Sequence, residues 1–279
     1  MEILINELSL CGQYTTVNDF TEQALPSLVM ALKDINPAKD FLLKKEDFYS
    51  SKVTTEFTLH DLFVGSLSRK YDEIRRSKSL LANLFEEPFW ERNIMQSADS
   101  KYSFKNMNIW GSSLAESYER DRIVLSFKHN DYLDILLPVY KNEEFLNIDN
   151  LFEKGLYLEL CWKRQIISFE GYCIGKFYGD KLDFTQIDPK NGFNLIVNEG
   201  DQRLFFDGFR KFSELTWQQI LVDDGFNYKE FNNKRYFRNI THQIYKFRIS
   251  QKYRCFGYIN QGVFFVLMFD LEHTLSDHG

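Results

Sequence analysis

The sequence predicts an α+β fold, with an N-terminal domain of mixed helices and strands and a small C-terminal domain of two helices packed on an antiparallel sheet. Strand-like and helical segments are interspersed through residues 1–199. Residues 202–222 repeat apolar side chains at helical spacing, whereas residues 244–269 alternate with the period of two that is typical of strands. The segment Asn198–Asp201 separates these patterns, so the expected domains are 1–199 and 200–279.

The composition is that of an ordinary globular protein. Hydrophobic residues make up 44% of the 279 residues and charged residues 27%. The longest apolar run, Gly262–Phe269, is far shorter than the roughly 20 residues that span a bilayer. The N-terminus "MEILINELSL" lacks the basic region of a signal peptide. We therefore expect a cytoplasmic protein that does not contact a membrane.

The four cysteines, Cys11, Cys161, Cys173 and Cys255, are scattered and form no CxxC pair. This pattern predicts free thiols rather than a zinc site or a redox motif. Nucleotide-binding loops and the HExxH and GxSxG motifs are also absent from the sequence. We therefore expect no bound metal and no cofactor.

The N-terminal domain is expected to begin with a strand over residues 2–10. A helix should follow over residues 16–36, beginning or bending at Pro26, and a long helix over residues 59–85 with Thr58 as its N-cap. A surface helix is expected over residues 112–121 and a helical turn over residues 145–153. Further strands are expected over residues 101–110, 122–129, 132–140, 155–162, 165–177, 181–187 and 192–198.

In the C-terminal domain, helices are expected over residues 202–213 and 216–222. Thr216 and Gln219 have the spacing of a capping box at the start of the second helix. Three antiparallel strands are expected over residues 244–250, 253–260 and 263–269. The last strand is apolar on both faces, which predicts a buried position within the sheet.

Positive charge is concentrated near the C-terminal end of a protein whose net charge is −6. Between Phe231 and Phe269 there are seven Lys and Arg residues and no Asp or Glu. Such an asymmetry indicates a surface that faces a polyanion. The alternative is a solvated sheet face whose charge is balanced by acidic helices elsewhere. The seven residues are Lys234, Arg235, Arg238, Lys246, Arg248, Lys252 and Arg254.

The strand period places Lys246 and Arg248 on one face of the first C-terminal strand. Arg254 on the next strand should lie beside Arg248 or Lys246, depending on the register. Like charges side by side on a sheet repel one another, so a fold tolerates them where the face is solvated or binds an anion. This hairpin is therefore the strongest candidate binding surface in the sequence.

The order of two helices, a basic segment, "YKFRI", "YRCFGYI" and "VFFVLMFD" resembles the RelE/HigB-type toxin fold of the RelE/ParE superfamily. The resemblance covers about residues 200–279. It implies a metal-independent endoribonuclease that acts on RNA or the ribosome through residues 231–258, in growth arrest or phage defence. It also implies an antitoxin or another protein partner. Residues 1–199 would then have a regulatory or targeting role.

The resemblance also implies roles for individual residues. The catalytic residues would be Lys246 and Arg248 on the first strand, Arg254 on the second, and His273 after the last. Arginines near a scissile phosphate stabilise transition-state charge, and a histidine transfers protons near neutral pH. The seven cations between Phe231 and Phe269 would bind the nucleic acid.

Two alternatives remain open at this point. The C-terminal tail "TLSDHG" lacks the basic or aromatic residues that many ribosome-dependent members have there. This favours a non-catalytic interaction protein whose toxin-like domain docks a protein or nucleic-acid partner. The other alternative is a nuclease within residues 1–199, where "EEPFWERN" places Glu86, Glu87 and Glu91 around Trp90. The simpler interpretation of that motif is a helix end followed by a loop with one buried tryptophan.

Overall fold

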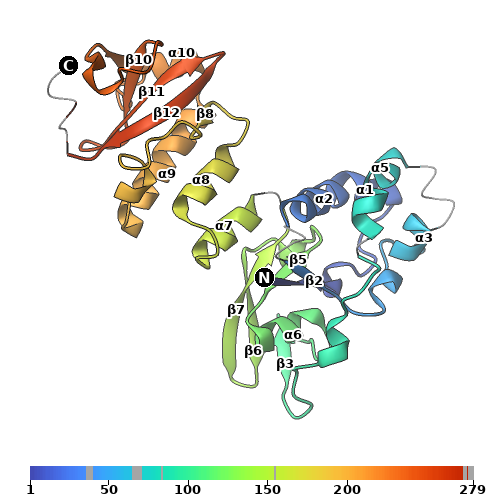
Figure 1. The fold of residues 1–279 in the computed structure, drawn as a ribbon. Coiled ribbons are helices and arrows are strands. Elements are labelled where there is room, and N and C mark those ends of the chain that lie inside the picture. The colour runs from blue at the N-terminus through green and yellow to red at the C-terminus, as the bar shows by residue number, and fades with distance from the viewer. Residues whose placement is uncertain (36–39, 65–70, 83, 154, 273–274, 276–279) are drawn as a thin grey trace. The chain divides into compact units, whose positions relative to one another are not determined.

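The computed structural model describes residues 1–35, 40–64, 71–82, 84–153, 155–272 and 275 (Figure 1). The chain divides into two compact units, Met1–Leu160 and Cys161–Gly279. Each unit contains helices and a mixed sheet, so the mixed α/β character expected from the sequence is confirmed. Among the described helices, none is both long and apolar enough to cross a membrane.

The expected domain boundary at residue 199 lies inside the second unit. Residues 161–198 pack with the C-terminal elements. For example, the ring of Tyr172 in this segment stacks on the ring of Phe206, with the centroids 5.1 Å apart. In addition, Leu182 pairs with Phe264 in the second sheet. These contacts join residues far apart in the sequence, and the change from strand to helix patterning near residue 199 does not reveal them.

The first unit is built on a sheet with the strand order β2-β1-β5-β7-β6-β3-β4. The neighbours β2, β1, β5 and β7 run parallel, and β6, β3 and β4 add antiparallel pairs. The expected opening strand is confirmed as β1. The strand bounds are β1 Glu2–Asn6, β2 Phe41–Leu43, β3 Tyr102–Phe104, β4 Met107–Asn108, β5 Ile123–Ser126, β6 Leu136–Lys141 and β7 Glu144–Leu151.

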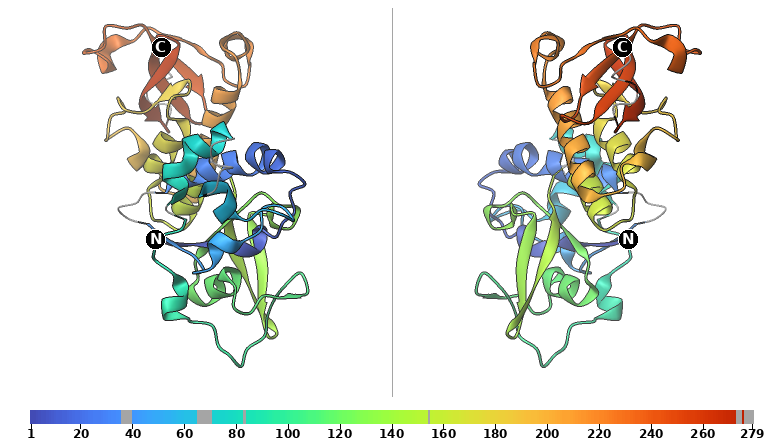
Figure 2. Two further views of the ribbon diagram at one scale, coloured as in Figure 1. Left: turned by 90° about the vertical axis from the view of Figure 1, so that its right-hand side faces the viewer. Right: turned by 90° about the vertical axis from the view of Figure 1, so that its left-hand side faces the viewer.

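Helices cover both faces of the parallel part of this sheet. Helix α6 packs against β1, β5, β6 and β7, and Leu4 and Val124 are buried with Leu114 beneath it. Ile3 and Ile5 alternate with Leu4 along β1, so they face the opposite side of the sheet, and both are buried. Helices α1 and α2 lie across the sheet from α6 (Figures 1 and 2). The helix bounds are α1 Val17–Gln23, α2 Leu25–Asp34, α3 Leu59–Phe63, α5 Asp72–Ala82 and α6 Ser113–Arg120.

The helix starts expected in this unit are confirmed. The hydroxyl groups of Thr16 and Thr58 cap α1 and α3, each within a capping box. The helix expected over residues 16–36 is two helices, and Pro26 lies in the first turn of the second. The long helix expected over residues 59–85 corresponds to α3 and α5, and the intervening residues 65–70 lie outside the described part.

Several expectations for the middle of the chain are wrong. Residues 155–162 and 165–177, expected as strands, contain the helices α7 Leu156–Lys163 and α8 Phe169–Phe177. The helical turn expected over residues 145–153 is part of strand β7. Residues 192–198 contain a 3-10 turn in place of the expected strand. Short apolar segments fit either periodicity, so tertiary packing decides between helix and strand.

The second unit contains the helices and strands expected for residues 200–279. Its sheet has the strand order β8-β12-β11-β10-β9, with β9 to β12 antiparallel and the short β8 parallel to β12. As expected, β12 lies inside the sheet rather than at its edge. The bounds are β8 Leu182–Asp183, α9 Glu199–Glu214, α10 Trp217–Val222, β9 Lys229–Phe231, β10 Ile244–Arg248, β11 Arg254–Asn260 and β12 Val263–Asp270.

Apolar residues are buried against both faces of this second sheet. On one face, which we call the helix face, Phe209 and Phe212 of α9 pack on Phe269 and Phe247. The opposite face is covered by residues 232–243, and we call it the loop face. Its buried cluster consists of Phe231, Phe237, Ile244, Phe256, Leu267 and Leu275.

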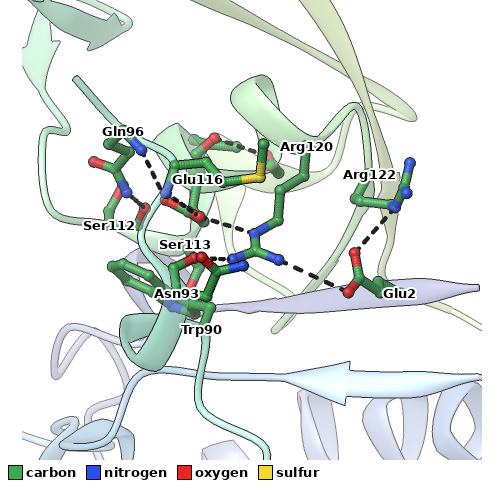
Figure 3. Close-up of polar contacts among 12 residues, drawn as sticks. Glu2, Trp90, Asn93, Gln96, Ser112, Ser113, Glu116, Arg120 and Arg122 are labelled. Carbon is green, nitrogen blue, oxygen red and sulfur yellow. Dashed lines mark hydrogen bonds and ion pairs between the residues drawn. The ribbon is translucent and has the colours of Figure 1, made fainter.

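A polar network around a buried carboxylate joins α6 to the chain before β3 (Figure 3). Glu116 is completely buried. Its Oε1 accepts hydrogen bonds from the Met95 amide at 2.9 Å and from Arg120 Nε at 2.8 Å. Its Oε2 accepts from the Gln96 amide at 3.3 Å. Arg120 also donates to the Asn93 carbonyl oxygen. One charge pair therefore fixes the segment 93–96 against the helix.

Two side chains that precede β3 form hydrogen bonds with the start of α6. Gln96 donates from Nε2 to the Ser112 carbonyl at 3.0 Å and accepts from the Gly111 amide at 2.7 Å. Trp90, which is 2% exposed, donates from Nε1 to Ser113 Oγ at 2.9 Å. The simpler interpretation of "EEPFWERN", a loop with one buried tryptophan, is therefore confirmed.

We predict that Glu116→Ala strongly destabilises the first unit. The substitution removes the buried carboxylate that pairs with Arg120 at 2.8 Å and leaves that arginine only its longer ion pair with Glu2 at 3.7 Å. Breaking a buried pair costs about 3–5 kcal/mol. The free energy of unfolding in urea measures the effect. Glu143→Ala is the matched control, because Glu143 is exposed in the turn between β6 and β7 and should change stability by less than about 0.5 kcal/mol. Equal stability of the two variants would contradict the structural role of Glu116.

Candidate nucleic-acid interface

The antiparallel pairing of β10 and β11 fixes the neighbours of the basic hairpin. Arg248 lies directly opposite Arg254, and Lys246 lies opposite Phe256. On its other side Lys246 pairs with Lys229 of β9. Paired residues share a face of the sheet, so Lys246, Arg248 and Arg254 all lie on the loop face. The structure thus brings together three of the four residues expected to be catalytic.

Two of these three cations are buried rather than presented to solvent. Lys246 is 4% exposed, and its ammonium lies 5.2 Å from the centroid of the Phe231 ring. A cation over an aromatic face at this distance is attracted by the ring quadrupole. Arg254 is 9% exposed. Arg248 is partly buried, and its Nε is a buried donor without a hydrogen-bond acceptor.

The hydrogen bonds of Arg254 hold the turn between β10 and β11. Its Nη1 donates to the carbonyl oxygens of Ser250, Gln251 and Tyr253 at 2.8, 3.1 and 3.0 Å. In the strand register Arg254 lies opposite the buried Asp270 of β12, whose carboxylate accepts from the Leu275 amide at 3.1 Å. The guanidinium is therefore part of the framework of the hairpin.

The other cations expected to bind nucleic acid are distributed over the loops. Arg235, Arg238 and Lys252 are exposed. Lys234 begins the 3-10 turn Lys234–Tyr236, and its side chain lies outside the described part of the chain. His273 also lies outside the described residues. The exposed members of this set thus lie in the loop 232–243 and at the hairpin tip, and the exposed Lys229 of β9 adds a further cation beside Lys246.

Two of the exposed arginines line a cavity of about 300 Å³ beside β12. Its lining combines two arginines with an exposed tyrosine, two residues with side-chain amides and apolar residues of the loop face. Its lining residues are Gln186, Asp188, Arg235, Tyr236, Phe237, Arg238, Asn239, Ile240, Leu267 and Met268.

One carboxylate lies among these residues, and its loop holds it in place. Asp188 accepts hydrogen bonds from the Lys190 amide at 2.9 Å and from Asn191 Nδ2 at 2.8 Å. These bonds, the backbone one first, hold the pKa of Asp188 below its usual value. Asp188 is therefore ionised at neutral pH. Against its charge the cavity has two arginines, so positive charge is in excess there.

The sequence indicated this cavity only in part. Arg235 and Arg238 were identified from the charge pattern, and the Asn-rich character of residues 226–243 was the available signal for Asn239. Gln186 and Asp188 gave no signal. They reach the cavity because the Asp188 amide donates to the Leu267 carbonyl at 2.8 Å, a contact between distant parts of the sequence.

Two of the three carboxylates of "EEPFWERN" interact with other residues of the first unit. Glu91 accepts a hydrogen bond from the Glu46 amide, and Glu86 acts electrostatically on the buried Lys44. Within the described residues, no group of three or more His, Cys, Asp or Glu side chains is arranged to hold a metal ion. The alternative of a nuclease within residues 1–199 gains no support from this motif.

Comparisons with protein-family models, with curated proteins and with solved structures found no match to this chain. A function must therefore be argued from the chemistry of the residues themselves.

We predict that Arg254→Ala destabilises the second unit by about 1.5–3 kcal/mol, the value of hydrogen bonds made by a charged group. The substitution removes the donor shared by three turn carbonyls. Urea unfolding followed by tyrosine and tryptophan fluorescence measures the loss. Lys252→Ala serves as the control, because Lys252 is exposed on the same turn. A stable Arg254→Ala protein would indicate that the arginine is retained for another purpose.

Proposed function

We propose that the second unit binds RNA at the cavity beside β12 and does so without cleaving it. The observation that supports this proposal is the placement of two exposed arginines, Arg235 and Arg238, in one cavity of about 300 Å³. This volume is at the lower end for small-ligand sites and suits one nucleotide unit. The resemblance to toxins that act on RNA or the ribosome favours RNA over other polyanions.

The groups around the cavity match the parts of a nucleotide. A guanidinium donates two parallel hydrogen bonds to a phosphate, which an ammonium cannot do. The Tyr236 ring is 49% exposed and offers a surface for stacking. Asn239 and Gln186 provide amide donors and acceptors that suit base edges and ribose hydroxyls.

Cleavage would place different demands on the second unit. The resemblance implies phosphate contacts from Lys246 and Arg254, yet both side chains are buried, and Arg254 donates to its own turn. For either group to reach a scissile phosphate, the loop face or the hairpin turn would have to open. Binding alone needs no such rearrangement, and this is why we prefer it to endoribonuclease activity.

Replacing Arg235 and Arg238 by glutamate is expected to weaken binding of a short single-stranded RNA by about tenfold or more, because both phosphate contacts become repulsive. Fluorescence anisotropy of a labelled RNA measures the affinity. Each phosphate contact to a single strand contributes about −0.7 to the slope of log affinity against log salt. The double alanine variant should therefore flatten this slope by about 1.4.

The matched control reverses two exposed cations on helices of the same unit, Lys176 and Arg203, and so changes the net charge equally. It should bind RNA nearly as well as the unmodified protein. Equal losses in both glutamate variants would mean that only overall charge matters. Full binding by the Arg235→Glu, Arg238→Glu variant would refute the proposed site.

The intact protein is expected to leave messenger RNA uncut in a translating extract and to allow normal bacterial growth when expressed. The physical reason is the burial of Lys246 and Arg254. Primer extension on the message detects cuts, and growth curves detect arrest. Cleavage that disappears in Arg254→Lys, at an unchanged melting temperature, would instead establish the endoribonuclease activity.

A further inference from the structure

Three aromatic rings form a continuous stack on the loop face of the second sheet. The centroids of His242 and Tyr258 lie 4.4 Å apart with an interplanar angle of 19°. The centroids of Tyr258 and Phe265 lie 5.1 Å apart with an angle of 10°. The three rings are thus nearly parallel and stacked one on the next, as the bases of a nucleic acid are.

Strand pairing positions two of the rings. Tyr258 of β11 lies directly opposite Phe265 of β12, so both side chains leave the sheet on the same face. Tyr258 also pairs with Ile244 of β10, which follows His242 by two residues. The residues that precede β10 therefore place His242 against the face of the Tyr258 ring that points away from Phe265. Three separate segments contribute to the stack.

The stack is accessible at the surface and not enclosed in the core. His242 is exposed, and Tyr258 and Phe265 are partly exposed. Beyond Phe265 the next strand is the two-residue β8, where the short side chain of Asp183 pairs beside the ring. At the other end of the stack His242 is exposed, so its outer face offers a place where another planar ring can extend the stack.

The stack and the arginine cavity lie on the same face and share two segments. Phe265 precedes the cavity residue Leu267 by two positions on β12, roughly 7 Å along the strand. His242 follows the cavity residue Ile240 by two positions in the loop. A single strand whose phosphate is held by Arg235 and Arg238 can therefore place a neighbouring base at the stack.

We propose that His242, Tyr258 and Phe265 form a base-stacking platform for single-stranded RNA. The proposal rests on the proposed function, since it takes the arginine cavity as the phosphate site. Stacking on aromatic rings is tolerant of sequence because every base has a π face. The bases of a duplex are already stacked on one another, so the platform selects single strands over duplexes.

The test compares three ligands of equal length by fluorescence anisotropy: a single-stranded RNA, its abasic counterpart with the same phosphates, and the duplex. The unmodified protein should prefer the intact single strand to both others. His242→Ala should weaken binding of the intact strand by about 5- to 150-fold, the range for loss of one stacked base. The same variant should bind the abasic strand as the unmodified protein does.

Two further variants guard against misinterpretation. Tyr258→Leu keeps an apolar side chain packed against the loop-face cluster, and it should reproduce the His242→Ala result at an unchanged melting temperature. Tyr178→Ala is the matched control, because Tyr178 is 88% exposed in the same unit and lies outside the stack. It should leave all three affinities unchanged.

The outcomes separate this proposal from the one on which it rests. Equal affinity of the unmodified protein for intact and abasic strands overturns the platform while leaving the arginine site in place. Equal affinity for single strand and duplex overturns it as well. A His242→Ala protein that loses both ligands alike also overturns it, because stacking cannot act on an abasic strand. If no ligand binds at all, both proposals fail.

Discussion

The packing of residues 232–243 on the loop face is the constraint on which the second unit depends. Phe231, the last residue of β9, and Phe237 in the middle of the loop pack on Phe256 and close a face that would otherwise meet water. Burial of this face takes Lys246 out of solvent and leaves its ammonium over an aromatic ring. The same loop holds Arg235 and Arg238 outward. The packing of this loop thus decides which cations are buried and which are exposed to a ligand.

The register of the basic hairpin has a related consequence. Placing Arg248 opposite Arg254 brings two like charges together, an arrangement that is costly on a sheet. The structure offsets this repulsion locally, because Arg254 donates to three turn carbonyls and lies directly opposite the buried Asp270 of β12 in the sheet register. A buried charge has a similar structural role in the first unit, where Glu116 accepts hydrogen bonds from Arg120 and two backbone amides. In both units, buried charge fixes chain segments that lack regular secondary structure.

The proposed binding surface combines two kinds of interaction that act on different parts of a nucleic acid. Arginines in the cavity suit the phosphates, whose attraction is strong, long-ranged and weakened by salt. The aromatic stack suits the bases, whose contribution is short-ranged and less sensitive to salt. Because the two lie on one face and share a loop, a change in that loop would affect both. Neither interaction requires a reactive group, in keeping with a binding function.

The sequence by itself determined the mixed helix-and-strand character, the main elements of residues 200–279 and the capped helices, because periodicity and capping are local properties of the chain. It also identified the charge concentration that includes Arg235 and Arg238. The sequence could not decide whether the apolar segments 155–162 and 165–177 are helices or strands, since short apolar runs fit both. Only the tertiary structure buried Lys246 and Arg254, placed residues 161–198 in the second unit and brought His242 onto Tyr258. The reason is that burial and stacking depend on contacts between distant residues, which local patterns do not encode.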